Sequence, residues 1–183
     1  GRPAIDTQVE IRDENDNPLP IGEIGQICAK GPQIMKGYWN KKEESEKALK
    51  GGWMHTGDAG RMDEEGFVFI QDRIKDMIVS GGENIYSTEV EAALFAHPDV
   101  VDAAVIGVPD EKYGEVVKAC IVKKEDSNVT ESDLISFCKD RIASYKKPQS
   151  IDFIDEVPRN ASGKVLKKVL REPYWKDQER QVS

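Results

Sequence analysis

Residues 1–72 alternate short apolar runs with polar turn clusters, a pattern typical of β-strands. Runs of strand length occupy residues 8–12 (QVEIR), residues 22–30 (GEIGQICAK) and residues 67–71. The last run follows a turn sequence at residues 63–66 (DEEG), so a hairpin is expected there. The exception is a polar stretch, ending at residue 50, where Asn40 is expected to cap a short helix. This part of the chain is therefore predicted to be a small, mostly β subdomain.

After Lys75 the pattern changes to strands that alternate with helices. Residues 77–80 and 84–86 predict two short strands that flank a Gly81-Gly82 turn. Apolar runs predict three further strands, at residues 101–108, 116–122 and 151–154. Strands mixed with helices in this way indicate a compact unit of the α+β class.

Two helices are predicted among these strands. Thr88 and Glu91 have the spacing of a capping box, and their helix should end just before Pro98, with His97 as a helix-end residue. Thr130 should open a second helix, because apolar residues recur at helical spacing after it.

The change from strands and turns to alternating strands and helices divides the chain into two pieces, which join near residues 73–75.

The composition is that of a soluble globular chain, with 183 residues, 38% hydrophobic and 33% charged. No apolar run reaches the roughly 18–20 residues of a membrane span, and the N-terminus does not read as a signal peptide. A cytoplasmic location is expected.

Neither a metal site nor a disulfide framework is expected from the spacing of potential ligands. Cys28, Cys120 and Cys138 form no CxxC pair and lie near no histidine at zinc-like spacing. They are interpreted as buried, reduced thiols. The acidic run at residues 13–17 is interpreted as a turn, because it lacks the glycine and the distal glutamate of a calcium loop.

The net charge of −8 argues against a nucleic-acid-binding surface, which needs a basic footprint. A polyanionic ligand would have to be held by local cations instead. Six candidates crowd into 26 positions near the C-terminus: Lys146, Lys147, Lys164, Lys167, Lys168 and Arg171. For most of them the alternative interpretation is a solvated helix face.

Two residues of the β part could contact a nucleotide. Asp58 follows a Thr-Gly pair, and its carboxylate could accept hydrogen bonds from two vicinal ribose hydroxyls, although for this triplet alone a turn aspartate is the more common explanation. Arg73 offers a planar donor fork for phosphate or ribose oxygens. Its alternative is a surface ion pair with Asp72 or Asp76.

Lys164 lies in a small-residue loop (NASGK) before a helix predicted at residues 165–170. The loop is not a P-loop, because Pro158 stands where that motif needs glycine and Val165 where it needs Ser or Thr. Lys164 could neutralise charge that builds up on a transferring phosphate, or it could be solvated. Gly82 could serve a tight turn and also let a ligand pass close to the backbone.

The order of four motifs adds a resemblance that covers nearly the whole chain. GEIGQICAKGPQIMKGYW is followed by GGWMHTGD, then by DRIKDMIVSGGENIYSTEVE, and finally by PRNASGK. In this order they closely resemble the C-terminal portion of the adenylate-forming superfamily. The sequences KDMIVSGGENIY and HPDV…AAVIGVPDEKYGE look most like those of fatty-acyl-CoA and related carboxylate–CoA ligases.

The resemblance implies a role for each candidate residue. Asp58 would hold the ATP ribose hydroxyls, and Arg73 would also contact the nucleotide. Lys75 matches the hinge about which the small C-terminal domain swings between two half-reactions. Gly82 matches the glycine that lines the pantetheine passage for coenzyme A, and Lys164 the lysine that supports adenylation.

One position departs from the family pattern. Asn84 stands where some CoA synthetases carry an arginine, which puts a charged CoA contact there in doubt. No protein metal ligand is expected in this chain.

The same resemblance implies the domain organisation. Residues 1–73 would form the last, β-barrel-like subdomain of a large adenylation domain, and residues 74–183 a mobile α+β C-terminal domain. The chain would be a piece of an AMP-forming carboxylate–CoA ligase, inactive alone, whose partner is its missing N-terminal domain. ATP, coenzyme A and Mg²⁺ would be bound mainly by that missing part. The carboxylic acid substrate would be recognised by residues outside this chain.

Two alternatives remain at this point. The acceptor of the acyl group could be a carrier-protein thiol instead of free CoA. A non-catalytic module could also retain the fold, but Asp58, Gly82 and Lys164 are all present.

Overall fold

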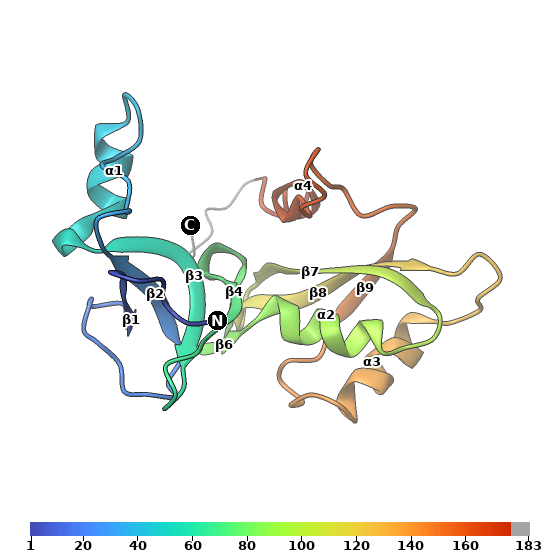
Figure 1. Ribbon diagram of the computed structural model, residues 1–183. Helices are drawn as coiled ribbons and strands as arrows, with labels where there is room; N and C mark the ends of the chain where they lie inside the picture. The colour runs from blue at the N-terminus through green and yellow to red at the C-terminus, as the bar shows by residue number, and fades with distance from the viewer. Residues whose placement is uncertain (177–183) are drawn as a thin grey trace. The chain divides into compact units, whose positions relative to one another are not determined.

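A computed structural model describes residues 1–176 and divides the chain into two compact units, Gly1–Ile74 and a unit that begins at Lys75 (Figure 1). Both units mix helices with largely antiparallel sheets, as the α+β prediction requires. Within residues 1–176, no helix combines the length and the apolar character that crossing a bilayer requires.

The first unit is built on a four-stranded antiparallel sheet in the order β1-β2-β3-β4. Its strands are β1 (Gln8–Arg12), β2 (Gly25–Lys30), β3 (Met54–Met62) and β4 (Val68–Arg73). Its small core includes Ile11, Cys28 and Trp53, and the Arg12 guanidinium lies 4.4 Å above the Trp53 ring. The predicted strands are present, and in the described chain the sheet is open: β1 and β4 are its two edges, so it is not a closed barrel.

The helix predicted in the first unit is present where it was expected, but its predicted N-cap residue is wrong. Helix α1 covers Lys42–Ala48, and its N-cap is Lys41, not Asn40. Asn40 instead has φ +54, a left-handed conformation that asparagine tolerates better than most residues. Asn40 therefore turns the chain just before the helix. A short 3₁₀ turn, Lys50–Gly52, then leads into β3.

The second unit contains a five-stranded sheet in which β8 is central. The strands are β5 (Ile78–Ser80), β6 (Glu83–Ile85), β7 (Val100–Asp110), β8 (Gly114–Lys123) and β9 (Ser150–Phe153). β7 pairs antiparallel along β8, whereas β9 pairs parallel to β8 and β5 meets it at one residue pair. All five predicted strands are therefore present, within two residues of the expected bounds.

Residues on the two long strands alternate between two cores. Val105 and Ile121 belong to the larger core, which includes residues of α2 (Ser87–Phe95) and α3 (Glu131–Lys139). Ile106 and Cys120 face a smaller core that includes Leu170 of α4 (Lys167–Arg171). Helices α2 and α3 thus lie on one face of this sheet and α4 on the other (Figure 1). Burial on both faces explains why these strands read as continuous apolar runs.

The two capping predictions have opposite outcomes. Thr130 caps α3 with a complete capping box, in which its side chain accepts a hydrogen bond from the Asp133 amide, so this prediction is confirmed. Helix α2 begins at Ser87 and its N-cap is Tyr86, so the cap predicted at Thr88 is wrong. Glu91 instead accepts a hydrogen bond from the Val105 amide at 2.8 Å.

The last predicted helix is shifted toward the C-terminus. It was expected at residues 165–170, but α4 begins at Lys167. Val165 instead forms an isolated antiparallel bridge with Arg159, which closes the loop that carries Lys164. The loop hairpin therefore delays the start of the helix.

Candidate functional site

Asp58 lies in a bulge of β3 and not after a separate turn. The register between β2 and β3 shifts at this point, and Gly57 adopts φ +76, a conformation that favours glycine. The Thr56 hydroxyl donates to the Ile27 carbonyl at 2.8 Å and accepts from the Asp58 amide at 3.1 Å. The Thr-Gly-Asp sequence thus re-aims the Asp58 carboxylate without interrupting the strand.

Arg73 and Asp58 are brought together by the pairing of β3 with β4. The two residues are direct partners in the strand register, and Arg73 Nε lies 3.4 Å from Asp58 Oδ1. The ion pair is formed with Asp58, not with the Asp72 or Asp76 partner that sequence reasoning considered. The Arg73 side chain is 53% exposed and that of Asp58 27%, so both groups remain accessible to a ligand. Together they place an acceptor and a donor fork at the end of β4.

Lys75 is the first residue of the second unit and lies in a 3₁₀ turn, Ile74–Asp76. Its carbonyl accepts a hydrogen bond from Arg171 Nη1 at 3.1 Å. Arg171 also pairs with Asp76, with Nη2 and Oδ1 separated by 2.9 Å. The backbone on the C-terminal side of Lys75 is therefore held by α4, in the same segment that follows Lys164.

Gly82 occupies the second position of a tight turn between β5 and β6. Gly81 and Gly82 have φ +59 and φ +88, the pair of positive values that a two-residue type I′ hairpin needs. A Cβ atom added at Gly81 would lie 3.2 Å from Tyr113, whereas one added at Gly82 would meet nothing within 4 Å among residues 1–176. The backbone of Gly82 is thus open to a ligand.

Lys164 ends a loop that the Asn160 side chain orders. Asn160 Oδ1 accepts hydrogen bonds from the Ser162 and Lys164 amides at 3.0 and 2.9 Å, and Gly163 turns the chain at φ +81. Arg159 adds a bond to the Gly163 carbonyl at 3.0 Å. The loop is therefore a hydrogen-bonded hairpin that presents an exposed lysine, not a phosphate-cradling loop.

The other basic residues of this region divide into paired and unpaired groups. Lys146 pairs with Glu89 at 2.7 Å, and this hydrogen bond raises the pKa of Lys146 although its burial opposes the shift. Lys167 pairs with Glu91 at 2.7 Å. Lys164 has no ion-pair partner within residues 1–176. These pairs were missed by sequence reasoning, because each joins residues more than fifty positions apart.

All three cysteines are buried and free, as predicted. Burial raises the pKa of the Cys28 and Cys120 thiols to about 11 and also raises that of Cys138. These thiols are therefore protonated and poorly nucleophilic at neutral pH. His97 lies just beyond α2, where its ring packs edge-on against Phe137 with centroids 4.8 Å apart.

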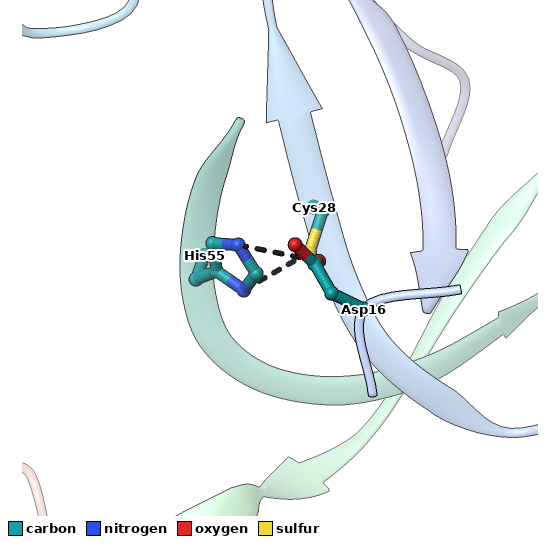
Figure 2. A group of neighbouring side chains, drawn as sticks. All are labelled: Asp16, Cys28 and His55. Carbon is teal, nitrogen blue, oxygen red and sulfur yellow. Dashed lines mark hydrogen bonds and ion pairs between the residues drawn. The ribbon is translucent and has the colours of Figure 1, made fainter. Parts of the chain in front are cut away.

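One cluster of potential metal ligands was not anticipated from the sequence. Asp16, Cys28 and His55 come together in the first unit (Figure 2), with one ligand atom of each within 4.8 Å of the others. Their sequence spacings of 12 and 27 residues match no short metal-binding motif. The pairing of β2 with β3 sets Cys28 opposite His55, and the turn after β1 brings Asp16 to them.

Two family models match the chain. The model described as AMP-binding enzyme C-terminal domain matches residues 89–164, which lie in the second unit. The model described as AMP-binding enzyme matches residues 1–39, in the first unit. The two matches thus fall on different units.

Curated relatives and solved structures agree with these matches. A long-chain-fatty-acid–CoA ligase of Escherichia coli O6:H1 is 44% identical over 172 residues, which are 94% of this chain and 30% of the relative. The fatty acid–[acyl-carrier-protein] ligase ScoC of Streptomyces coeruleorubidus is 43% identical over 183 residues, 100% of this chain and 35% of the relative. The crystal structure of ATP-bound MatB from Rhodopseudomonas palustris is 38% identical with a TM-score of 0.90, over 97% of this chain and 35% of that one. The chain therefore spans about a third of the length of the relatives it matches.

Proposed function

Since the chain belongs to the adenylate-forming superfamily of AMP-binding enzymes, as its C-terminal portion, we propose that it is part of an ATP-dependent carboxylate–CoA ligase. The proposed enzyme forms an acyl-adenylate and then an acyl-CoA thioester, and its acid is a fatty acid or a related carboxylic acid. One relative is a long-chain-fatty-acid–CoA ligase and another is a fatty acid–[acyl-carrier-protein] ligase, and the chain covers about a third of each. The isolated chain should therefore form acyl-adenylate far more slowly than an intact ligase does, if it forms any.

The observation that carries the proposal is that Lys164 is exposed, held in place by its backbone and not neutralised by a carboxylate. It stands at the end of a hydrogen-bonded hairpin, exposed, and without an ion-pair partner in the described chain. Lys146, Lys167 and Arg171 of the same region are all paired with carboxylates, whereas Lys147 and Lys168, like Lys164, have no ion-pair partner within residues 1–176. The ordered loop distinguishes Lys164 from these two. A lysine that is positioned by its backbone but left unneutralised is suited to an anionic ligand.

In the proposed adenylation step, Lys164 lowers the repulsion between two anions. A carboxylate oxygen attacks the α-phosphorus of ATP, and the bond from that phosphorus to the pyrophosphate oxygen breaks. Both reactants are negatively charged, so a cation beside them stabilises the transition state. Asp58 accepts hydrogen bonds from the two ribose hydroxyls, while Arg73 orients Asp58 and contacts the nucleotide.

In the proposed second step, the CoA thiol attacks the acyl carbonyl, the carbonyl carbon–oxygen bond to AMP breaks, and the thiol proton passes to solvent. Gly82 would line the passage of the pantetheine arm, because no side chain stands there to obstruct it. One arrangement of the active site cannot be complementary to both transition states, so a rotation about Lys75 between the two half-reactions is expected.

Mg²⁺ would be held by segments outside this chain. We place the parent protein in the cytoplasm, where its buried thiols stay reduced.

The proposal is tested with Lys164→Ala in the intact ligase. Adenylation, measured by pyrophosphate exchange, should fall by about 10²- to 10³-fold, the usual cost of removing one transition-state contact of this kind. Thioester formation from supplied acyl-adenylate should change by only about twofold, because Lys164 takes no part in that step. Lys168→Ala is the matched control, since Lys168 lies on the adjacent helix. Equal loss of both half-reactions would refute the role of Lys164.

A second candidate concerns the acceptor alone. The 43% identical relative ScoC is a fatty acid–[acyl-carrier-protein] ligase, so a carrier-protein thiol could replace free CoA. Offering each acceptor in turn to the intact enzyme with its acyl-adenylate separates the two. A non-catalytic role would leave the intact protein without pyrophosphate exchange for any carboxylic acid.

A further inference from the structure

The cluster of Asp16, Cys28 and His55 is almost closed to solvent. Asp16 lies in the turn after β1, Cys28 in β2 and His55 in β3, and Figure 2 shows the three side chains converging. The side chains of Asp16 and His55 are 18% and 14% exposed, and Cys28 is 0% exposed. Nothing in the proposed ligase chemistry uses these three residues.

A hydrogen bond from His55 to Gln26 determines which nitrogen of His55 is free. Gln26 Oε1 lies 2.9 Å from His55 Nδ1, and an amide oxygen can only accept, so Nδ1 carries the hydrogen. The lone pair is therefore on Nε2, which is buried and has no hydrogen-bond partner in the described chain. A buried polar atom without a partner is costly, and it marks a position that a ligand can satisfy.

The lone pair of His55 Nε2 faces a carboxylate. Asp16 Oδ1 lies 3.5 Å away, which is too long for a good hydrogen bond and places two acceptors opposite each other. A cation between them would satisfy both. Two ligands of one tetrahedral zinc ion, each about 2.0–2.1 Å from the metal, lie roughly 3.3–3.4 Å apart. The observed separation is close to that value.

We propose that Asp16, Cys28 and His55 form a binding site for a zinc-like divalent transition-metal ion. Thiolate, imidazole and carboxylate are the three ligand types that zinc takes in proteins. The contact of Gln26 with Nδ1 is the supporting hydrogen bond that metal-binding histidines usually make through their second nitrogen. Cys28 Sγ lies 3.5 Å from the same Nδ1, so the thiol must turn toward Nε2 to bind the same ion. The site lies wholly within the first unit, and it does not depend on the proposed ligase function.

One feature opposes metal binding. Arg12 contacts Asp16 Oδ1 at 3.2 Å, the same oxygen that faces His55 Nε2, and Arg12 is itself paired with Glu10. A bound ion would therefore have to share Oδ1 with Arg12 or displace it. On binding, the sulfur–hydrogen bond of Cys28 breaks, a sulfur–metal bond forms and the proton passes to solvent.

The test is a titration of the 183-residue chain, free of any affinity tag, with Co²⁺ as a spectroscopic substitute for Zn²⁺. One Co²⁺ per chain should bind and give a thiolate-to-cobalt charge-transfer band, and added Zn²⁺ should remove that band. Cys28→Ser and His55→Gln should abolish the band and weaken binding by at least about tenfold. Cys138→Ser is the matched control, because it removes a buried thiol of the other unit, and it should leave the band unchanged.

Two results would overturn the proposal. One is the absence of a thiolate band in the wild-type chain, which would mean that a proton alone lies between His55 and Asp16. The other is binding that Cys28→Ser leaves unchanged, which would place the ion on unrelated surface groups. Far-UV circular dichroism checks that each variant folds, and if Cys28→Ser does not, Asp16→Asn must weaken binding by a comparable factor for the proposal to stand.

Discussion

Arg171→Met should loosen the segment that begins the second unit. Arg171 is the residue of α4 that holds the Lys75 carbonyl and the Asp76 carboxylate, at 3.1 and 2.9 Å. The substitution keeps most of the apolar stem but removes both donors. It therefore leaves the carboxylate of Asp76, whose side chain is only 14% exposed, without this partner.

The size of the effect follows from the burial of the pair. Removing one partner of a buried ion pair costs about 3–5 kcal/mol. Arg171 and Asp76 are 13% and 14% exposed, so water can partly compensate and we expect about 2–3 kcal/mol. At about 1.4 kcal/mol per factor of ten, the opening equilibrium of this segment should rise by roughly 30- to 150-fold.

The assay is amide hydrogen exchange, read by mass spectrometry on peptides that cover residues 75–80. Arg141→Met is the control, since Arg141 is exposed, stacks on Phe137 and donates to the Phe137 carbonyl at 3.1 Å. It should cost no more than about 1 kcal/mol and should not change exchange at residues 75–80. If Arg171→Met changes that exchange by less than about threefold, the reasoning about the buried pair is refuted.

Two further predictions concern the second unit. Gly82→Ala should lower the free energy of unfolding in urea by about 1–2 kcal/mol, because φ +88 strains any residue with a Cβ although the space around it is open; a loss above about 3 kcal/mol would contradict that description. Burial alone would raise the pKa of Asp152, but hydrogen bonds from Lys118 and Tyr174 lower it below the ordinary 3.8. The stability from these contacts is thus present above that value and is lost as the pH falls through the lower, folded-state pKa. Thermal unfolding should find Asp152→Asn less stable than wild type at neutral pH, with a gap that narrows below about pH 4; a gap independent of pH would count against the assignment.

Much of the fold could be predicted because its signals are local. The strands of the second unit were found from apolar runs, and the helix start at Thr130 was found because apolar residues recur at helical spacing just after it. The cap predicted at Thr88 failed although its spacing was correct. Glu91, which should have closed that box, is hydrogen-bonded to the Val105 amide on β7. The helix thus starts earlier than predicted, and Glu91 also makes a tertiary contact.

The candidate residues divide in the same way. Sequence motifs singled out Asp58, Arg73 and Lys164, but they could not say that Asp58 and Arg73 face each other as register partners. Motifs also left open which of the basic residues near the C-terminus form ion pairs. That depends on which carboxylates from α2 reach Lys146 and Lys167, and the structure pairs both.

The sequence by itself determined the class of the fold, most of its strands and the family to which the chain belongs. These rest on periodicity and on ordered motifs, which are properties of neighbouring residues. Only the tertiary structure decided that Arg171 holds the backbone at Lys75, and that Asp16, Cys28 and His55 lie in one cluster of the first unit. Contacts of this kind join residues 12 to 96 positions apart. They depend on strand register and on where each helix packs, and no local pattern encodes them.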